Sequence, residues 1–396
     1  MGIRVTSATV PTVPTVPTVP TVPTVPTVLT ALQAGGVDVR MHHIERLDLV
    51  ITNRCILRCE YCFIEKGSDV MSEETASAAT NLLLRSLGDR KLLLIYGAEP
   101  LLYWNLVKKI ILDAKRQARQ MGKTISISLG TNAILFGRAI LQFLKSHDVR
   151  VSLTLDGPKE AHDRYRRFAN SHGSFNAVTR KLPILFAEIP NRKISALCCV
   201  HPQTAAASFD NFSFLCSQGF RNINLEPIEA PGILWSQISL RDFSKSLVQI
   251  ANFILNSVKN GDFIFLNTVN REILSCSLSD SRGCVCPVAR TLQVYPKGEM
   301  TFTPFLFNSS RRSESIVGRI PEGLSPRYQR CNYDERDSRC RACLSNYLNG
   351  RGENAQEALS LRNAASIQIA RAIRRLATNN PVFSRYLEQA RERVFE

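Results

Sequence analysis

The sequence predicts an α/β protein whose parallel sheet curls toward an incomplete barrel. From residue 46 onward, short apolar runs bounded by polar or turn residues alternate with longer segments of helical spacing. This alternation implies βα units joined by right-handed crossovers, and hence parallel strands covered by helices. Six such units predict a partial (β/α)6 barrel, in which the loops after the strands carry the chemistry.

The six predicted strands are short enough to be buried strands of a parallel sheet. They span residues 47–51, 92–96, 125–129, 149–155, 194–200 and 223–225. The helices predicted between them span residues 72–87, 101–120, 138–146, 176–186 and 204–216. Together these elements define a first domain, which we expect to cover residues 46–230.

Beyond Pro227 the alternation of strands and helices ends. A helical stretch at 242–258 predicts a helical connector, followed by a turn-rich region with cysteines and then a basic helical tail. In the tail, Ile369 and Ile373 fall at helical spacing, whereas Pro381 is expected to interrupt the helix. We expect the tail to pack back on the core. The expected boundaries are 231–275 for the connector, 276–353 for the cysteine-containing domain and 354–396 for the tail.

The first 45 residues contain a repeat of Val, Pro and Thr with a strict period of three. Proline lacks a backbone donor and fixes φ, so this tail is expected to be extended or disordered. Such a regular repeat also resembles a tandem duplication of coding DNA. We therefore offer the hypothesis that translation starts near Met41, which an intact mass of the native protein would test.

Composition places the chain among soluble proteins of a reducing compartment. Eight of the twelve cysteines fall into two groups, which favours metal ligation over a disulfide scaffold and predicts a cytoplasmic protein. No apolar run reaches the length of a membrane span, so no membrane anchor is expected. The net charge of +16 suits an acidic partner, but Lys and Arg are spread along the chain, so a nucleic-acid partner is not expected.

Cys55, Cys59 and Cys62 form a compact group directly after the first predicted strand. Their spacing also describes one face of a helix, so three buried cysteines are the structural alternative. Charged neighbours favour a loop instead, in which three thiolates hold a [4Fe–4S] cluster and leave one iron open to another ligand. Zinc is the alternative metal, but structural zinc needs four ligands, and no fourth candidate lies near this loop.

This loop resembles the cluster-binding signature of the radical SAM superfamily, including an aromatic residue, Tyr61, before the last cysteine. The resemblance implies a TIM-like partial barrel, a [4Fe–4S] cluster and S-adenosyl-L-methionine (SAM) bound at the open iron. It also implies reductive cleavage of SAM to a 5′-deoxyadenosyl radical that abstracts hydrogen from a substrate. A low-potential electron donor such as flavodoxin or ferredoxin is implied as a partner.

Further segments fit this resemblance after successive strands. Gly97-Ala98-Glu99-Pro100 resembles the Gly-Gly-Glu-Pro segment along the methionine moiety, with Glu99 available to the ammonium group. Thr131-Asn132 resembles the ribose segment, with Ala133 in place of glycine. Thr154 begins a segment similar to Ser-Ile-Asp-Gly-Pro and is assigned to the ribose, and Arg166 is assigned to the methionine carboxylate. The cofactor-binding residues implied are Tyr61, Gly97, Ala98, Glu99, Pro100, Thr131, Asn132, Thr154 and Arg166.

The second cysteine group resembles a degenerate SPASM domain, a carrier of auxiliary clusters. Thr303, Asn349 and Glu353 stand where cysteines would be expected, so two complete auxiliary clusters are not predicted. One auxiliary iron–sulfur cluster or a zinc ion is one interpretation, and free thiols are the other. The preferred ligand set is Cys286, Cys331, Cys340 and Cys343. Of the four cysteines outside these two groups, Cys198, Cys199 and Cys216 are interpreted as core residues, and Cys276 is left unassigned.

The resemblance is nearest to SPASM-type peptide maturases and anaerobic sulfatase maturases, which predicts a peptide or protein substrate. A sulfatase maturase itself is disfavoured, because Thr303 and Pro304 replace an aspartate of that group. The first alternative is a radical SAM dehydrogenase or oxidoreductase acting on a small molecule. The second is a non-catalytic protein that binds zinc and nucleic acid. The sequence assigns no residue to catalysis beyond cofactor binding.

Overall fold

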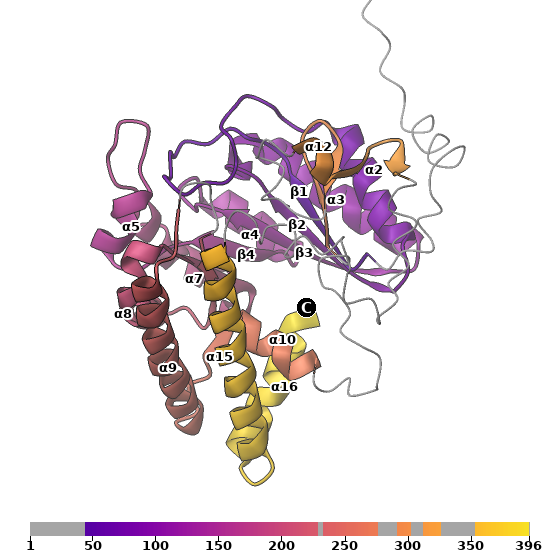
Figure 1. Cartoon of the computed structure of the whole chain (residues 1–396). Coiled ribbons are helices and arrows are strands. Elements are labelled where there is room, and N and C mark those ends of the chain that lie inside the picture. Colours follow the sequence, from indigo (N-terminus) through magenta and orange to yellow (C-terminus); the bar gives the residue numbers. More distant parts are fainter. Residues whose placement is uncertain (1–43, 229–232, 276–290, 302–311, 326–352, 396) are drawn as a thin grey trace, which may run out of the picture.

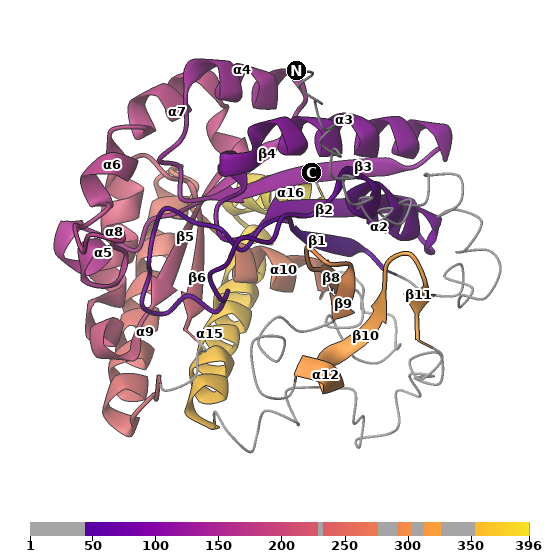
Figure 2. The ribbon, with the colours of Figure 1, turned by 90° about the horizontal axis from the view of Figure 1, so that it is seen from above.

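The computed structural model describes residues 44–228, 233–275, 291–301, 312–325 and 353–395. Within these residues the chain is built on one sheet with the strand order β11-β10-β9-β8-β1-β2-β3-β4-β5-β6-β7. The part from β8 to β7 is parallel throughout, and β9, β10 and β11 continue it as antiparallel strands. Figures 1 and 2 show this sheet curving, with helices along its outer side.

The strands have the following bounds: β1 (Arg46–Val50), β2 (Arg90–Tyr96), β3 (Thr124–Thr131), β4 (Arg150–Thr154), β5 (Ile194–Val200), β6 (Asn222–Pro227), β7 (Phe265–Leu266), β8 (Thr291–Val294), β9 (Glu299–Thr301), β10 (Ile316–Arg319) and β11 (Gly323–Leu324). All six predicted strands are present, and the α/β partial barrel is confirmed. The structure adds β7 and β8, which extend the parallel sheet at its two sides. Sequence reasoning missed them because β7 has only two residues and β8 lies in the turn-rich region.

The helices have the following bounds: α2 (Glu73–Arg85), α3 (Trp104–Gln120), α4 (Arg138–Ser146), α5 (Lys159–Tyr165), α6 (Phe175–Thr179), α7 (Leu182–Glu188), α8 (Ser208–Ser217), α9 (Gln237–Lys259), α10 (Asn267–Ser275), α12 (Arg312–Ser315), α15 (Glu353–Ala377) and α16 (Pro381–Phe395), with 3-10 turns η2 (Pro100–Tyr103), η3 (Asn191–Lys193) and η4 (Pro202–Ala207). None of the described helices is both long and apolar enough to cross a membrane. The prediction of a single helix at 176–186 is wrong. The helical conformation is interrupted between α6 and α7, and Pro183 lies in the first turn of α7.

Alternate residues of the barrel strands point to opposite faces of the sheet. In β5 this places Cys198 against the covering helices, where it is fully buried, and Cys199 on the other face, where it is half-buried. The prediction of core positions is therefore confirmed for Cys198 and Cys216. It is wrong for Cys199, which packs beside Tyr61 and Tyr165 outside the main core.

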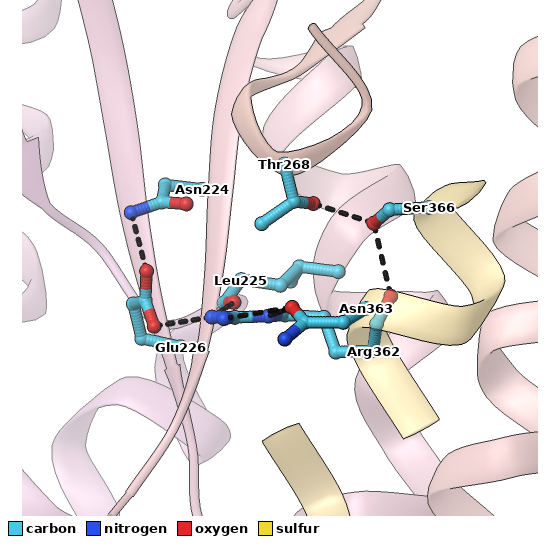
Figure 3. A network of polar contacts seen from close by, with 7 residues as sticks. All are labelled: Asn224, Leu225, Glu226, Thr268, Arg362, Asn363 and Ser366. Atoms are coloured by element: carbon cyan, nitrogen blue, oxygen red, sulfur yellow. Dashed lines mark hydrogen bonds and ion pairs between the residues drawn. The ribbon is translucent and has the colours of Figure 1, made fainter. Parts of the chain in front are cut away.

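The C-terminal helices return to the barrel, as the sequence predicts. The helix boundary falls at Pro381, the first residue of α16. The helix α15 packs against α9, α10 and α16, and both α10 and α15 contact β6 (Figure 2). Arg362 of α15 is buried and donates a 3.0 Å hydrogen bond from Nη1 to the carbonyl of Leu225, and it also forms an ion pair with Glu226 (Figure 3). This contact fixes α15 to the carboxyl end of β6.

Residues 1–43 of the predicted N-terminal tail and the auxiliary cysteines Cys286, Cys331, Cys340 and Cys343 lie outside the described residues.

Candidate functional site

The loop between β1 and α2 carries the three predicted cluster ligands and closes on itself at its base. Thr52 and Val70 form an antiparallel bridge, and the backbone N–H of Gly67 donates to the carbonyl of Asn53 at 3.2 Å. Apart from isolated bridges and turns, the loop has no regular secondary structure, so the alternative of three cysteines on one helix face is wrong.

A second segment of the chain holds the far side of this loop. The backbone N–H of Arg58 donates to the carbonyl of Arg167 at 2.7 Å, and that of Glu60 donates to the carbonyl of Tyr165 at 3.0 Å. Tyr165 is the last residue of α5, the helix that follows β4, so the cysteine loop lies between the carboxyl ends of β1 and β4. This is the edge at which barrels of this class place their chemistry.

Cys55, Cys59 and Cys62 are all free and half-buried in this loop. Cys55 Sγ accepts a hydrogen bond from the backbone N–H of Leu57 at 3.3 Å, and the amide of Asn132 lies 3.9 Å from it. Burial raises the pKa of the Cys55 and Cys59 thiols, while the Leu57 hydrogen bond opposes this for Cys55 and the Arg166 charge opposes it for Cys59.

The donor set fits a multinuclear cluster. Among the described residues, no three His, Cys, Asp or Glu side chains converge on a point that could hold a single metal ion. A [4Fe–4S] cluster does not need such convergence, because each of its irons takes one protein thiolate. Three thiols on one loop therefore suit three irons of a cubane.

The Gly97-Ala98-Glu99-Pro100 segment lies directly against this loop. Gly97 has φ +145°, and a Cβ atom there would lie 2.6 Å from the carbonyl oxygen of Thr52. The N–H of Ala98 donates to that same carbonyl at 2.9 Å. A glycine is required at 97 by both its backbone conformation and this close approach, whereas Ala98 has no positive φ and needs none.

Glu99 is fully buried and joins two of the predicted cofactor segments. Its Oε1 accepts hydrogen bonds from the backbone N–H of Leu101 at 3.0 Å and the hydroxyl of Thr131 at 2.7 Å. Its Oε2 accepts from the backbone N–H of Asn132 at 2.8 Å. Burial raises the pKa of Glu99, and these hydrogen bonds oppose the rise. The carboxylate thus holds the ends of β2 and β3 together, and its pairing with the cofactor's ammonium group stays a prediction.

A second group of buried side chains, linked by hydrogen bonds, lies next to Cys59. The hydroxyl of Tyr61 donates to Asp156 Oδ2 at 2.5 Å and accepts from Arg166 Nη1 at 2.8 Å, while Asp156 Oδ1 accepts from the backbone N–H of Cys199 at 3.0 Å. Arg166 Nε is buried and has no hydrogen-bond partner among the described residues. An orphaned donor of a buried guanidinium beside the cysteine loop fits an anionic group of a bound cofactor.

The structure brings all the predicted cofactor residues to one edge of the sheet. Pro100 begins η2, and Thr154 is half-buried at the last position of β4. Ala133, which stands where the family segment has glycine, has φ 65° and is fully buried.

Two residues at the site were missed by sequence reasoning. Asp156 lies within the segment that begins at Thr154, but the sequence does not show that its carboxylate meets Tyr61. Lys66, whose Nζ lies 2.7 Å from Cys62 Sγ, carries no motif signal at all.

The fold and this site define an iron–sulfur enzyme of the α/β partial-barrel class, and comparisons with known proteins agree. Residues 49–208 match the Radical SAM superfamily. A cysteine-type anaerobic sulfatase-maturating enzyme of Clostridium perfringens is 24% identical over 61% of this chain and 70% of its own length. A serine-type enzyme of Klebsiella aerogenes is 23% identical over 68% of this chain and 67% of its own length.

Solved structures show the same fold. The structure of anSMEcpe with bound AdoMet has a TM-score of 0.62 and 18% identity, and the match covers 87% of this chain and 98% of that chain. The structure of anSMEcpe with AdoMet and the Cp18Cys peptide has a TM-score of 0.60 and 19% identity, with 83% of this chain and 99% of that chain covered. Residues 49–208 form a radical SAM domain, a domain whose cofactors are a [4Fe–4S] cluster and SAM, and the chain is related to anaerobic sulfatase-maturating enzymes.

Proposed function

We propose that this radical SAM enzyme is a maturase that abstracts a hydrogen atom from a residue of a peptide or protein substrate. The main support is the placement of three half-buried thiols, Cys55, Cys59 and Cys62, at the edge of the sheet where the predicted cofactor segments meet. The peptide substrate is supported by the relatives, which are named as sulfatase-maturating enzymes, and by a similar structure whose title includes a bound peptide.

In this proposal the three cysteines hold three irons and leave the fourth for SAM. When bound, the cluster and SAM supply an adenosyl radical for hydrogen abstraction. The side chains of the site hold its loops and its charged groups in place. Glu99 fixes the two neighbouring loops, and Asp156 neutralises and orients the guanidinium of Arg166 through Tyr61. Because these groups are buried and already bonded, they need no reorganisation when a ligand arrives.

Further parts of the proposal extend beyond the described residues. One auxiliary cluster or zinc ion on Cys286, Cys331, Cys340 and Cys343 stays a prediction, as do a flavodoxin or ferredoxin as electron donor and a cytoplasmic location. The iron content of a variant that lacks Cys340 and Cys343 would test the auxiliary site.

The enzymatic part of the proposal is tested by anaerobic reconstitution with iron and sulfide, followed by dithionite and SAM. Wild type is expected to release 5′-deoxyadenosine, and Cys59→Ala is expected to release none. Cys216→Ala is the matched control, because Cys216 is buried in α8, one of the helices that cover the sheet, and should leave nucleoside formation unchanged. Equal nucleoside release by wild type and Cys59→Ala would contradict the assignment.

The substrate class is tested with a heated lysate of the native organism, separated into a low-mass fraction and a polypeptide fraction. The polypeptide fraction is expected to increase 5′-deoxyadenosine formation, and digestion of that fraction with a protease should abolish the increase. Stimulation by the low-mass fraction that survives protease treatment would instead support the small-molecule alternative.

A further inference from the structure

Lys66 makes a contact that neither the cofactor segments nor the proposed substrate explains. Its Nζ lies 2.7 Å from Cys62 Sγ and 3.2 Å from the carbonyl oxygen of Ile64. The side chain is half-buried, and Ile64 beneath it is buried. The ammonium group is therefore fixed between one sulfur and one carbonyl.

The backbone at the base of the loop determines this position. Gly67, the next residue, donates its N–H to the carbonyl of Asn53, and the N–H of Asn53 donates to the carbonyl of Asp69 at 3.3 Å. Lys66 is thus held where the loop returns to its start, close to Cys55 as well as to Cys62. Burial raises the pKa of the Cys55 thiol, and the Lys66 charge is among the influences that lower it.

The three sulfurs have different surroundings among the described residues. Cys55 has neutral donors, the N–H of Leu57 and the amide of Asn132. Cys59 lies in the field of the buried Arg166 guanidinium. Only Cys62 has a hydrogen bond from a charged side chain within the described part of the chain.

We propose that Lys66 is a positioning residue for the iron–sulfur cluster, and that its ammonium group raises the reduction potential of the cluster through the N–H···S bond to Cys62. This inference rests on the proposed use of Cys62 as a cluster ligand. Reduction adds negative charge that is shared by the ligand sulfurs, so a cation bonded to one of them stabilises the reduced state more than the oxidised state. Outer-shell partners of this kind orient ligands and tune the metal centre.

The test compares Lys66→Gln, Lys66→Arg and Arg54→Gln, all reconstituted anaerobically. Arg54 is an exposed residue next to Cys55, and its loss removes the same charge from the loop without removing a bond to sulfur. The midpoint potential is measured by redox titration with EPR detection, without SAM, alongside iron and sulfide content. Lys66→Gln is expected to lower the equilibrium constant for one-electron reduction about tenfold, which is about 59 mV. The midpoint potential of Lys66→Arg should stay closer to that of wild type, and the midpoint potential of Arg54→Gln should change little.

Several results separate this inference from the proposed function. A Lys66→Gln protein with full iron content and the wild-type potential would overturn the inference and leave the enzyme assignment intact. An equal shift in Arg54→Gln would also overturn it, because overall loop charge would then suffice. If Lys66→Gln loses the cluster while Lys66→Arg keeps it, the positioning role is supported; loss in both would overturn it. A wild-type protein that takes up no cluster would contradict the proposed function itself.

Discussion

Replacement of Glu99 tests whether its carboxylate holds the site together. Glu99 is fully buried and accepts three hydrogen bonds, from Leu101, Thr131 and Asn132. In Glu99→Gln a single amide oxygen remains, so the amide nitrogen must face at least one of these donors. An unmet buried donor costs about 1–3 kcal/mol, which is the expected loss in the free energy of unfolding. Glu99→Ala leaves three donors unmet and should cost about 3 kcal/mol or more.

Urea unfolding followed by far-UV circular dichroism measures these losses, and pH gives a second check. Because burial raises the pKa of Glu99 above its usual value of 4.5, the stability linked to this group is present below that value and is lost as the pH rises through the raised pKa. The free energy of unfolding of wild type should therefore exceed that of Glu99→Gln by a larger amount in mildly acidic buffer than at about pH 8. A Gln variant as stable as wild type at both pH values would refute this account of Glu99.

Three further substitutions have defined outcomes. Gly97→Ala should lower the free energy of unfolding by about 1–3 kcal/mol, because the new Cβ meets the Thr52 carbonyl; unchanged stability in urea unfolding would contradict the close approach. Ala133→Gly should change stability by less than about 1 kcal/mol in the same assay, because relief of the left-handed backbone offsets the lost methyl burial, and a larger loss would contradict strain at this residue. Arg362→Ala should cost about 3 kcal/mol and increase amide hydrogen exchange in α15 and α16 while β1 to β4 stay protected; unchanged exchange there would argue against the ion pair with Glu226 as the anchor.

The part of the fold that follows from local sequence was predictable. A parallel strand buried on both faces reads as a short apolar run, and each of the six predicted runs became a strand of the barrel. The spacing of Cys55, Cys59 and Cys62 predicts a cluster-binding loop from sequence alone, because ligand number and type are local features of the sequence. The alternation within β5 is also a local signal, and it separates Cys198 from Cys199 by face.

Contacts between distant segments were decided only by the tertiary structure. The pairing of β8 with β1 and the bond from Arg362 to β6 join residues far apart in the sequence, and no local pattern encodes their partners. The same holds for Glu99 with Thr131 and for Tyr61 with Asp156. The sequence by itself determines which residues are of a type that can bind a cluster. The charges and hydrogen bonds around each sulfur depend on how the loops pack in space.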